Sequence, residues 1–430
     1  MRAPAVPRTL VVAAALALGA AVSLGLARFS YALLLPPMRA DLDWSYLTAG
    51  AMNTVNAVGY LAGALLLPRV LRRFDARTVL LAGSAAAGVL LCLHGVVVAD
   101  AALYGLRVLT GIASAAAFVA GGLMAARLAT ASENNGLAGA ANCTEAPLAP
   151  GAPHVTGGND AGDGRRGVAS TRRGTGLVLG IYYGGTGLGI VISALLVGPI
   201  AGRAVAHAWQ GAWIALGVAA LLSTLAMRVP TRHLALARSV VPRSLRFEWA
   251  PLRFALAAYF LFGLGYIGYM TFVITLLREL RMDAAAIVGF YVVLGLGVIA
   301  SSWLWAGLLQ RCRSGAALAL LNGLLAVATG LPVLSAHPVA VFVSGALFGS
   351  VFLSVVASTT ALVRHNLPPA AWAGGIGAFT IVFAAGQIVG PSLVGWVADG
   401  PGGLVRGFVV SAGVLLVGAL TAWRQRPLAA

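Results

Sequence analysis

Residues 10–36 read LVVAAALALGAAVSLGLARFSYALLLP and contain one charged residue, Arg28. A transmembrane helix needs about 20 predominantly apolar residues to cross the hydrocarbon core of a bilayer, and this stretch is long enough. Similar runs recur along the chain, and we predict twelve spans in all. Their approximate ranges are 10–36, 46–67, 78–98, 101–125, 174–199, 208–227, 252–277, 286–308, 315–335, 338–362, 371–397 and 403–423.

The composition of the whole chain agrees with a membrane protein. Of its 430 residues, 60% are hydrophobic and only 10% are charged, and the mean hydropathy is +0.91. A water-soluble domain carries roughly 25% charged residues to cover its surface. We therefore expect this chain to have the lipid bilayer as its surroundings.

The basic residues predict the orientation of the spans. The net charge is +17, and every basic residue is an arginine. If the N-terminus is cytoplasmic, most arginines lie in cytoplasmic connections, which follows the positive-inside rule. We therefore predict a bacterial inner-membrane protein with both termini in the cytoplasm. Because the charges are spread over many short loops, we exclude a nucleic-acid partner. Five arginines are expected outside: Arg39, Arg203, Arg278, Arg281 and Arg406.

An internal repeat divides the chain into two related halves. The stretch Gly25-Leu-Ala-Arg-Phe-Ser-Tyr31 aligns with Gly263-Leu-Gly-Tyr-Ile-Gly-Tyr269, and the same spacing relates Gly111 to Gly349. Six helices in each half give both halves the same orientation. We therefore predict an all-α membrane protein with twelve transmembrane helices in two parallel six-helix repeats.

The repeat also locates an insertion. Gly198-Pro199 aligns with Gly390-Pro391 at a shorter spacing, so the first half holds extra residues before this point. Residues 130–173 are rich in Gly, Ala, Asn and Pro and lack apolar periodicity, which predicts a disordered cytoplasmic insert. The expected organisation is an N-terminal half at 1–227, a basic cytoplasmic linker at 228–251 and a C-terminal half at 252–430.

Several motifs resemble those of the major facilitator superfamily. Arg107-Val-Leu-Thr-Gly111 is similar to its Arg-x-x-x-Gly motif in helix 4. The stretches at 25–36, 180–185 and 386–391 resemble more narrowly the YbfB/YjiJ-like bacterial branch. Asp75, in the connection between helices 2 and 3, does not occupy the usual place of the family's acidic residue. The Gly-Pro motif of helix 5 and its repeat in helix 11 predict close helix contacts and comprise Gly185, Gly198, Pro199, Gly202, Gly377, Gly386, Gly390 and Pro391.

Two arginines within helices are the strongest candidates for binding. Arg28 and Arg107 lie at a similar predicted depth, and a charge at the centre of a membrane helix costs about 2.5–3.5 kcal/mol. The resemblance places their helices around a central cavity. Because no acidic residue lies in a helix core, an anionic ligand between the two arginines is one hypothesis. The alternative is that each arginine stabilises helix packing. Further candidates for the same site are Asn53, Asn56, Tyr266, Tyr269 and Gln387.

The resemblance implies a secondary active transporter that moves a small solute by alternating access. The two arginines favour an organic anion, while an exporter of apolar or cationic compounds is the alternative. A non-transporting membrane sensor is the alternative from another class. The residues show no catalytic constellation and no metal-ligand spacing, so we expect no enzyme activity, metal or cofactor. We also expect the protein to be a monomer.

Overall fold

The computed structural model describes residues 6–144, 163–201, 205–234 and 247–428. Within these residues, twelve helical spans are long and apolar enough to cross a membrane, which confirms the predicted number. The first span consists of α1 (Val6–Ala20), the π-helix η1 (Ala21–Phe29) and α2 (Tyr31–Asp41). The remaining helices are α3 (Tyr46–Val70), α4 (Ala76–His94), α5 (Asp100–Thr144), α6 (Asp163–Ala201), α7 (Ala208–Arg228), α8 (Arg253–Glu279), α9 (Ala284–Leu304), α10 (Ala306–Arg311), α11 (Ala316–Leu334), α12 (Pro338–Asn366), α13 (Trp372–Ala398) and α14 (Gly403–Trp423), with short 3₁₀ turns at Pro230–His233, Ala250–Leu252 and Pro369–Ala371.

Polar side chains in the connections begin several of these helices. The side chains of Ser45, Asp75 and Asp283 accept hydrogen bonds from backbone N–H groups in the first turns of α3, α4 and α9. Such caps satisfy donors that have no partner within the helix. Asp75 also accepts a hydrogen bond from the Thr78 hydroxyl, which lowers the pKa of this carboxyl group below its usual value. Asp75 therefore has a local role as the N-cap of α4.

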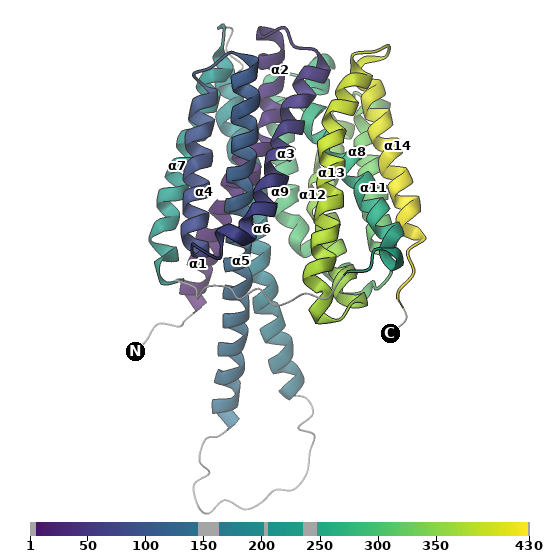
Figure 1. Ribbon diagram of the computed structural model, residues 1–430. Coiled ribbons are helices and arrows are strands. Elements are labelled where there is room, and N and C mark those ends of the chain that lie inside the picture. The colour runs from purple at the N-terminus through teal and green to yellow at the C-terminus, as the bar shows by residue number, and fades with distance from the viewer. Residues whose placement is uncertain (1–5, 145–162, 202–204, 235–246, 429–430) are drawn as a thin grey trace, which may run out of the picture.

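The spans form two groups with the same orientation (Figure 1). The labels α4, α5 and α7 lie on one side of the molecule, and α11, α13 and α14 lie on the other. Contacts between the groups come mainly from α3 with α13, α6 with α9 and α2 with α8. This arrangement is the two-repeat fold that the sequence predicts.

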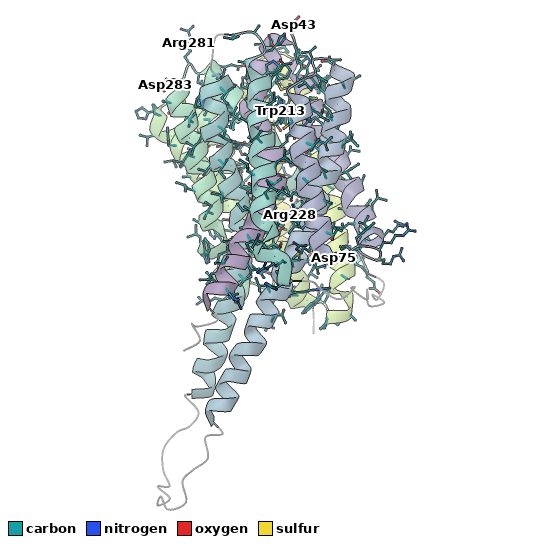
Figure 2. All side chains as sticks on the ribbon, turned by 90° about the vertical axis from the view of Figure 1, so that its left-hand side faces the viewer. Asp43, Asp75, Trp213, Arg228, Arg281 and Asp283 are labelled. Atoms are coloured by element: carbon teal, nitrogen blue, oxygen red, sulfur yellow. The ribbon has the colours of Figure 1, made fainter. Side chains whose placement is uncertain are left out.

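The bundle has two ends that we distinguish by the chain termini. The end where α1 begins and α14 ends is called the terminal face, and the other end is called the opposite face. Figure 2 shows Asp43, Arg281 and Asp283 at the opposite face, while Asp75 lies toward the terminal face. The terminal face is the one that the arginine distribution assigns to the cytoplasm.

The predicted disorder of residues 130–173 was wrong for the described part of this segment. Helix α5 continues to Thr144 and α6 begins at Asp163, so that a pair of helices extends beyond the terminal face (Figure 1). Extending an existing helix avoids the cost of nucleation. Residues 145–162 lie outside the described part of the chain.

Glycines allow the spans to approach each other closely. A Cβ atom at Gly111 would overlap the carbonyl oxygen of Asn56, and one at Gly185 would overlap that of Ala17. In the second group, Gly386 and Gly390 contact the backbone of α8 in the same way. Gly198 lies against Val288 of α9, so this glycine joins the two groups. Pro199 and Pro391 lie inside α6 and α13, and Gly202 lies outside the described residues.

Candidate functional site

The first span changes its helical geometry where it crosses the centre of the bundle. Residues 21–29 form a π-helix and are all buried. The N–H of Ser30 donates to the carbonyl of Gly25 at 3.0 Å, and the phenol of Tyr291 in α9 donates to the carbonyl of Phe29 at 2.6 Å. Segments of π-helix are rare and frequently occur at functional sites. Arg28 lies within this segment. The sequence pattern did not predict a π-helix here.

Arg107 is fully buried, and each nitrogen of its guanidinium group has a partner. Nη1 donates to the carbonyl of Ala27 at 2.9 Å, Nε to the carbonyl of Met52 at 3.4 Å, and Nη2 to Oδ1 of Asn53 at 3.3 Å. The aromatic ring of Tyr31 lies 4.8 Å from the guanidinium carbon. Arg107 therefore joins the first span, α3 and α5. Because it contacts Ala27, it lies at the level of Arg28, as the sequence predicts.

The two predicted asparagines belong to this same network. Nδ2 of Asn53 donates to the hydroxyl of Thr271 in α8 at 2.7 Å, which links the network to the second group of spans. Nδ2 of Asn56 donates to the carbonyl of Arg107 at 3.0 Å. Both amides are buried, and both hold helices together in this conformation.

Arg28 differs from Arg107 in its partners. Its side chain is only 3% exposed, yet neither Nε nor Nη2 has a hydrogen-bond partner among the described residues. The guanidinium carbon lies 5.4 Å from the centre of the Tyr60 ring, and the charge is close enough to Tyr266 to interact with it electrostatically. A buried charge with unpaired donors is costly, so this residue needs an explanation.

The charge of Arg28 also acts on a residue of the second group of spans, Tyr266 in α8. Tyr266 accepts a hydrogen bond from the amide of Gln387 in α13, and its ring stacks on that of Phe262 at 4.7 Å. Phe383 lies 5.7 Å from Tyr266, and Phe352 of α12 lies 6.0 Å from it. We call Arg28, Tyr60, Tyr266 and Gln387 the Arg28 cluster. Tyr266 and Gln387 were predicted as candidates, whereas Tyr60, Phe352 and Phe383 were not.

Tyr269 has a different environment from Tyr266. Its hydroxyl hydrogen-bonds to that of Ser344 at 2.7 Å, and its ring stacks on Phe348 of α12 at 4.0 Å. These partners, together with Phe408, belong to the second group of spans, and none is a member of the Arg28 cluster. The observed contacts of Tyr269 are therefore packing contacts within that group.

Hydrogen bonds join the two groups near the opposite face. The carboxylate of Asp399 accepts from the backbone N–H groups of Tyr46 and Leu47 at 2.7 and 2.9 Å, at the N-terminus of α3. The phenol of Tyr46 also donates to Glu279 at the end of α8. A carboxylate at a helix N-terminus is stabilised by the helix dipole. We call these contacts the Asp399 latch, and no sequence motif indicated it.

Metal chemistry has no support in the described residues. Within the described ranges, no group of three or more His, Cys, Asp or Glu side chains could hold a metal ion. Asp41 pairs with His207 near the opposite face, away from the helix centres where the two arginines lie. At Arg28, Nε and Nη2, which have no partner among the described residues, are parallel donors whose geometry matches that of a carboxylate.

Comparisons with known proteins agree on the fold. A family model described as "Uncharacterised MFS-type transporter YbfB" matches residues 20–142 and 167–423. A comparison with curated proteins found no match.

Solved transporters share the architecture at low sequence identity. A bacterial homologue of the human lysosomal transporter Spinster, in an inward-facing and unoccupied conformation, has a TM-score of 0.67 and 14% identity, with coverage of 98% of this chain and 97% of that chain. The nucleoside transporter NupG has a TM-score of 0.64 and 14% identity, with coverage of 97% and 98%. The human organic anion transporter MFSD10 (TETRAN) has a TM-score of 0.58 and 14% identity, with coverage of 98% and 100%. At this identity the likeness shows the fold alone.

Proposed function

The chain belongs to the family of YbfB-type major facilitator transporters, and we propose from its site that it moves a small organic anion across a bacterial inner membrane. Twelve spans and the family together make it a multi-pass membrane transporter. The proposal adds the substrate class, secondary active transport and the orientation with both termini in the cytoplasm.

The observation that supports an anion most strongly is the state of Arg28. A guanidinium group in the bilayer interior costs about 2.5–3.5 kcal/mol, and Arg28 has two donors without partners. A carboxylate could accept two parallel hydrogen bonds from these donors and neutralise the charge. The charge of Arg28 acts on Tyr266 in the second group of spans, and Gln387 donates to the hydroxyl of Tyr266. The anion would therefore be bound between the two groups.

Arg107 receives a different role from Arg28 in this proposal. A clamp that used both arginines would require Arg107 to give up its bonds to Ala27, Met52 and Asn53. Each broken bond would cost a charge-assisted hydrogen bond in a buried region. We therefore assign the anion to Arg28 and regard Arg107 as a positioning residue that holds the π-helix against α3.

Alternating access fits a site shared by both groups. The Asp399 latch closes the opposite face, which we assign to the periplasm. An anion that contacts Arg28 on one side and Tyr266 on the other would bind best when the groups close around it. A ligand shifts such an equilibrium only through different affinities for the two states. Contacts from both groups would supply that difference.

Export of cations is the second candidate, and the site argues against it. A buried positive charge at Arg28 would repel a cation in a region of low dielectric constant. The similar solved structures do not decide the substrate class, because they include an organic anion transporter and a nucleoside transporter. Arg28 therefore supplies the preference for an anion.

Counterflow into proteoliposomes tests this proposal. A panel of labelled monocarboxylates, dicarboxylates, a nucleoside and an organic cation would be compared for the natural chain, Arg28→Gln and Arg28→Lys. At least one carboxylate should be transported, and Arg28→Gln should lower its uptake at least tenfold, with poor rescue by lysine. Arg406→Gln, at an exposed arginine near the opposite face, is the matched control. Uptake of the cation with no effect of carboxylates, or normal carboxylate uptake by Arg28→Gln, would refute the proposal.

A further inference from the structure

A row of nearly parallel aromatic rings lies beside the Arg28 cluster. Tyr259, Phe262 and Tyr266 of α8 stack with Phe383 of α13, with ring centres 4.9, 5.3 and 5.7 Å from Phe383 and interplanar angles of 11–19°. Phe352 of α12 continues the row at 6.0 Å and 10° from Tyr266. We call these five rings the aromatic wall.

The aromatic wall reaches the guanidinium group from the second group of spans. Phe352 contacts the ring of Phe29, which follows Arg28 in the chain, at 5.6 Å. The charge of Arg28 acts on Tyr266 through space, and the ring of Tyr60 lies over the guanidinium group from the first group of spans. Aromatic rings of both groups therefore lie near the buried charge, with Tyr60 over the guanidinium group and Phe352 against the adjacent Phe29.

The Arg28 cluster and the aromatic wall together contain one guanidinium group, one amide and three phenols. The phenols are those of Tyr60, Tyr259 and Tyr266, and the amide of Gln387 already donates to Tyr266. A sugar or a dicarboxylate would need more donors and acceptors, because buried polar groups without partners are costly. Aromatic faces instead suit a flat apolar body, since rings prefer stacked or edge-to-face partners.

We propose that the transported anion is an aromatic monocarboxylate, with its carboxylate on Arg28 and its ring against the aromatic wall. The inference rests on the proposed function and narrows its substrate class. Phe383 is the ring most able to meet a ligand, because it is half-buried while Phe262 and Tyr266 are buried. An aromatic ring should gain about two- to tenfold in affinity over a saturated ring of the same size.

The test compares benzoate with cyclohexanecarboxylate, which share one carboxylate and a six-carbon ring but differ in aromaticity. Calorimetric titration of the purified full chain in nanodiscs should show benzoate binding about two- to tenfold more tightly. Phe383→Leu should remove this preference and keep the affinity for cyclohexanecarboxylate, and Phe352→Leu provides a second, independent variant. Phe342→Leu, at a ring that packs on Phe290 rather than on the wall, is the control and should keep the preference.

The outcomes separate this inference from the proposed function. Equal affinities for the two acids, both weakened by Arg28→Gln, would overturn the aromatic substrate and leave the anion site standing. A benzoate preference that survives in both Phe383→Leu and Phe352→Leu would overturn the placement of the ring. If neither acid binds, the aromatic monocarboxylate is overturned. If Arg28→Gln binds the acids as tightly as the natural chain does, the anion site is overturned as well.

Discussion

Replacing each buried arginine with methionine should affect the stability of the protein differently at the two positions. Methionine keeps a long unbranched stem but carries no charge. Arg107→Met removes three hydrogen bonds and leaves the acceptors on Ala27, Met52 and Asn53 buried. Hydrogen bonds between membrane helices are worth about 0.6 kcal/mol on average, and those to a charged group about 1.5 kcal/mol or more. The three bonds together are worth about 2–4.5 kcal/mol, and both substitutions remove one buried charge, so Arg107→Met should be less stable than Arg28→Met by about this amount.

Arg28→Met should instead stabilise the ligand-free protein. It removes a charge that costs about 2.5–3.5 kcal/mol in the bilayer interior. The substitution breaks no hydrogen bond at Nε or Nη2 of Arg28, because neither nitrogen has a partner among the described residues. It does remove the contact with the Tyr60 ring, which is worth about 0.5–2 kcal/mol. The difference is a net gain of about 0.5–3 kcal/mol, so removal of the charge outweighs loss of the aromatic contact.

Reversible unfolding of the purified protein in bicelles, followed by tryptophan fluorescence without added anion, measures both changes. Arg406→Met, at an exposed arginine, should stay within about 0.5 kcal/mol of the natural chain and serves as the control. If Arg28→Met destabilises the protein as much as Arg107→Met, then Arg28 has structural partners. The reason for assigning it to an anion would then be removed.

Three further predictions concern the frame around the site. Asp399→Ala removes two hydrogen bonds at the N-terminus of α3, so distances between spin labels on α2 and α8 should show the opposite face open several-fold more often. Arg406→Ala, at an exposed arginine, should leave these distances unchanged. Gly386→Ala should lower the free energy of unfolding by about 1–3 kcal/mol, because its Cβ would overlap the carbonyl oxygen of Phe260. Gly377→Ala in the same helix has open space and should be neutral or stabilising, so equal effects of the two substitutions would contradict the packing argument. Replacing residues 132–175 with about ten Gly and Ser residues should keep folding and transport within a few fold, because the fourth span ends at Ala131 and the fifth begins at Gly176. Loss of all folded protein would contradict this prediction.

The fold could be predicted from the sequence because its signals are local. Apolar runs of about 20 residues report spans directly, and the aligned stretches at 25–31 and 263–269 report the repeat. The helical extensions at 131–144 and 163–173 could not be predicted in this way. Their composition resembles that of a loop, while their helicity continues helices that the bundle has already formed.

The site was predicted only in part, because partners matter more than residue types. Arg28 and Arg107 are alike in sequence, since each is a lone charge in an apolar run. What distinguishes them is the set of backbone carbonyls near Arg107, and a carbonyl carries no sequence signal. Part of the aromatic wall could have been found in the sequence, because Tyr259, Phe262 and Tyr266 are spaced by three and four residues and so share one face of a helix.

Solid-state NMR tests the central claim, that Arg28 holds the carboxylate, most directly. The protein would carry ¹⁵N-labelled arginine in a lipid bilayer, with benzoate labelled by ¹³C at its carboxylate. A dipolar contact between the carboxylate carbon and guanidinium nitrogens is predicted for the natural chain and for Arg107→Lys if that variant folds, and it should disappear in Arg28→Met. A contact that persists in Arg28→Met, or one that disappears only in folded Arg107→Lys, would contradict the assignment of the anion to Arg28.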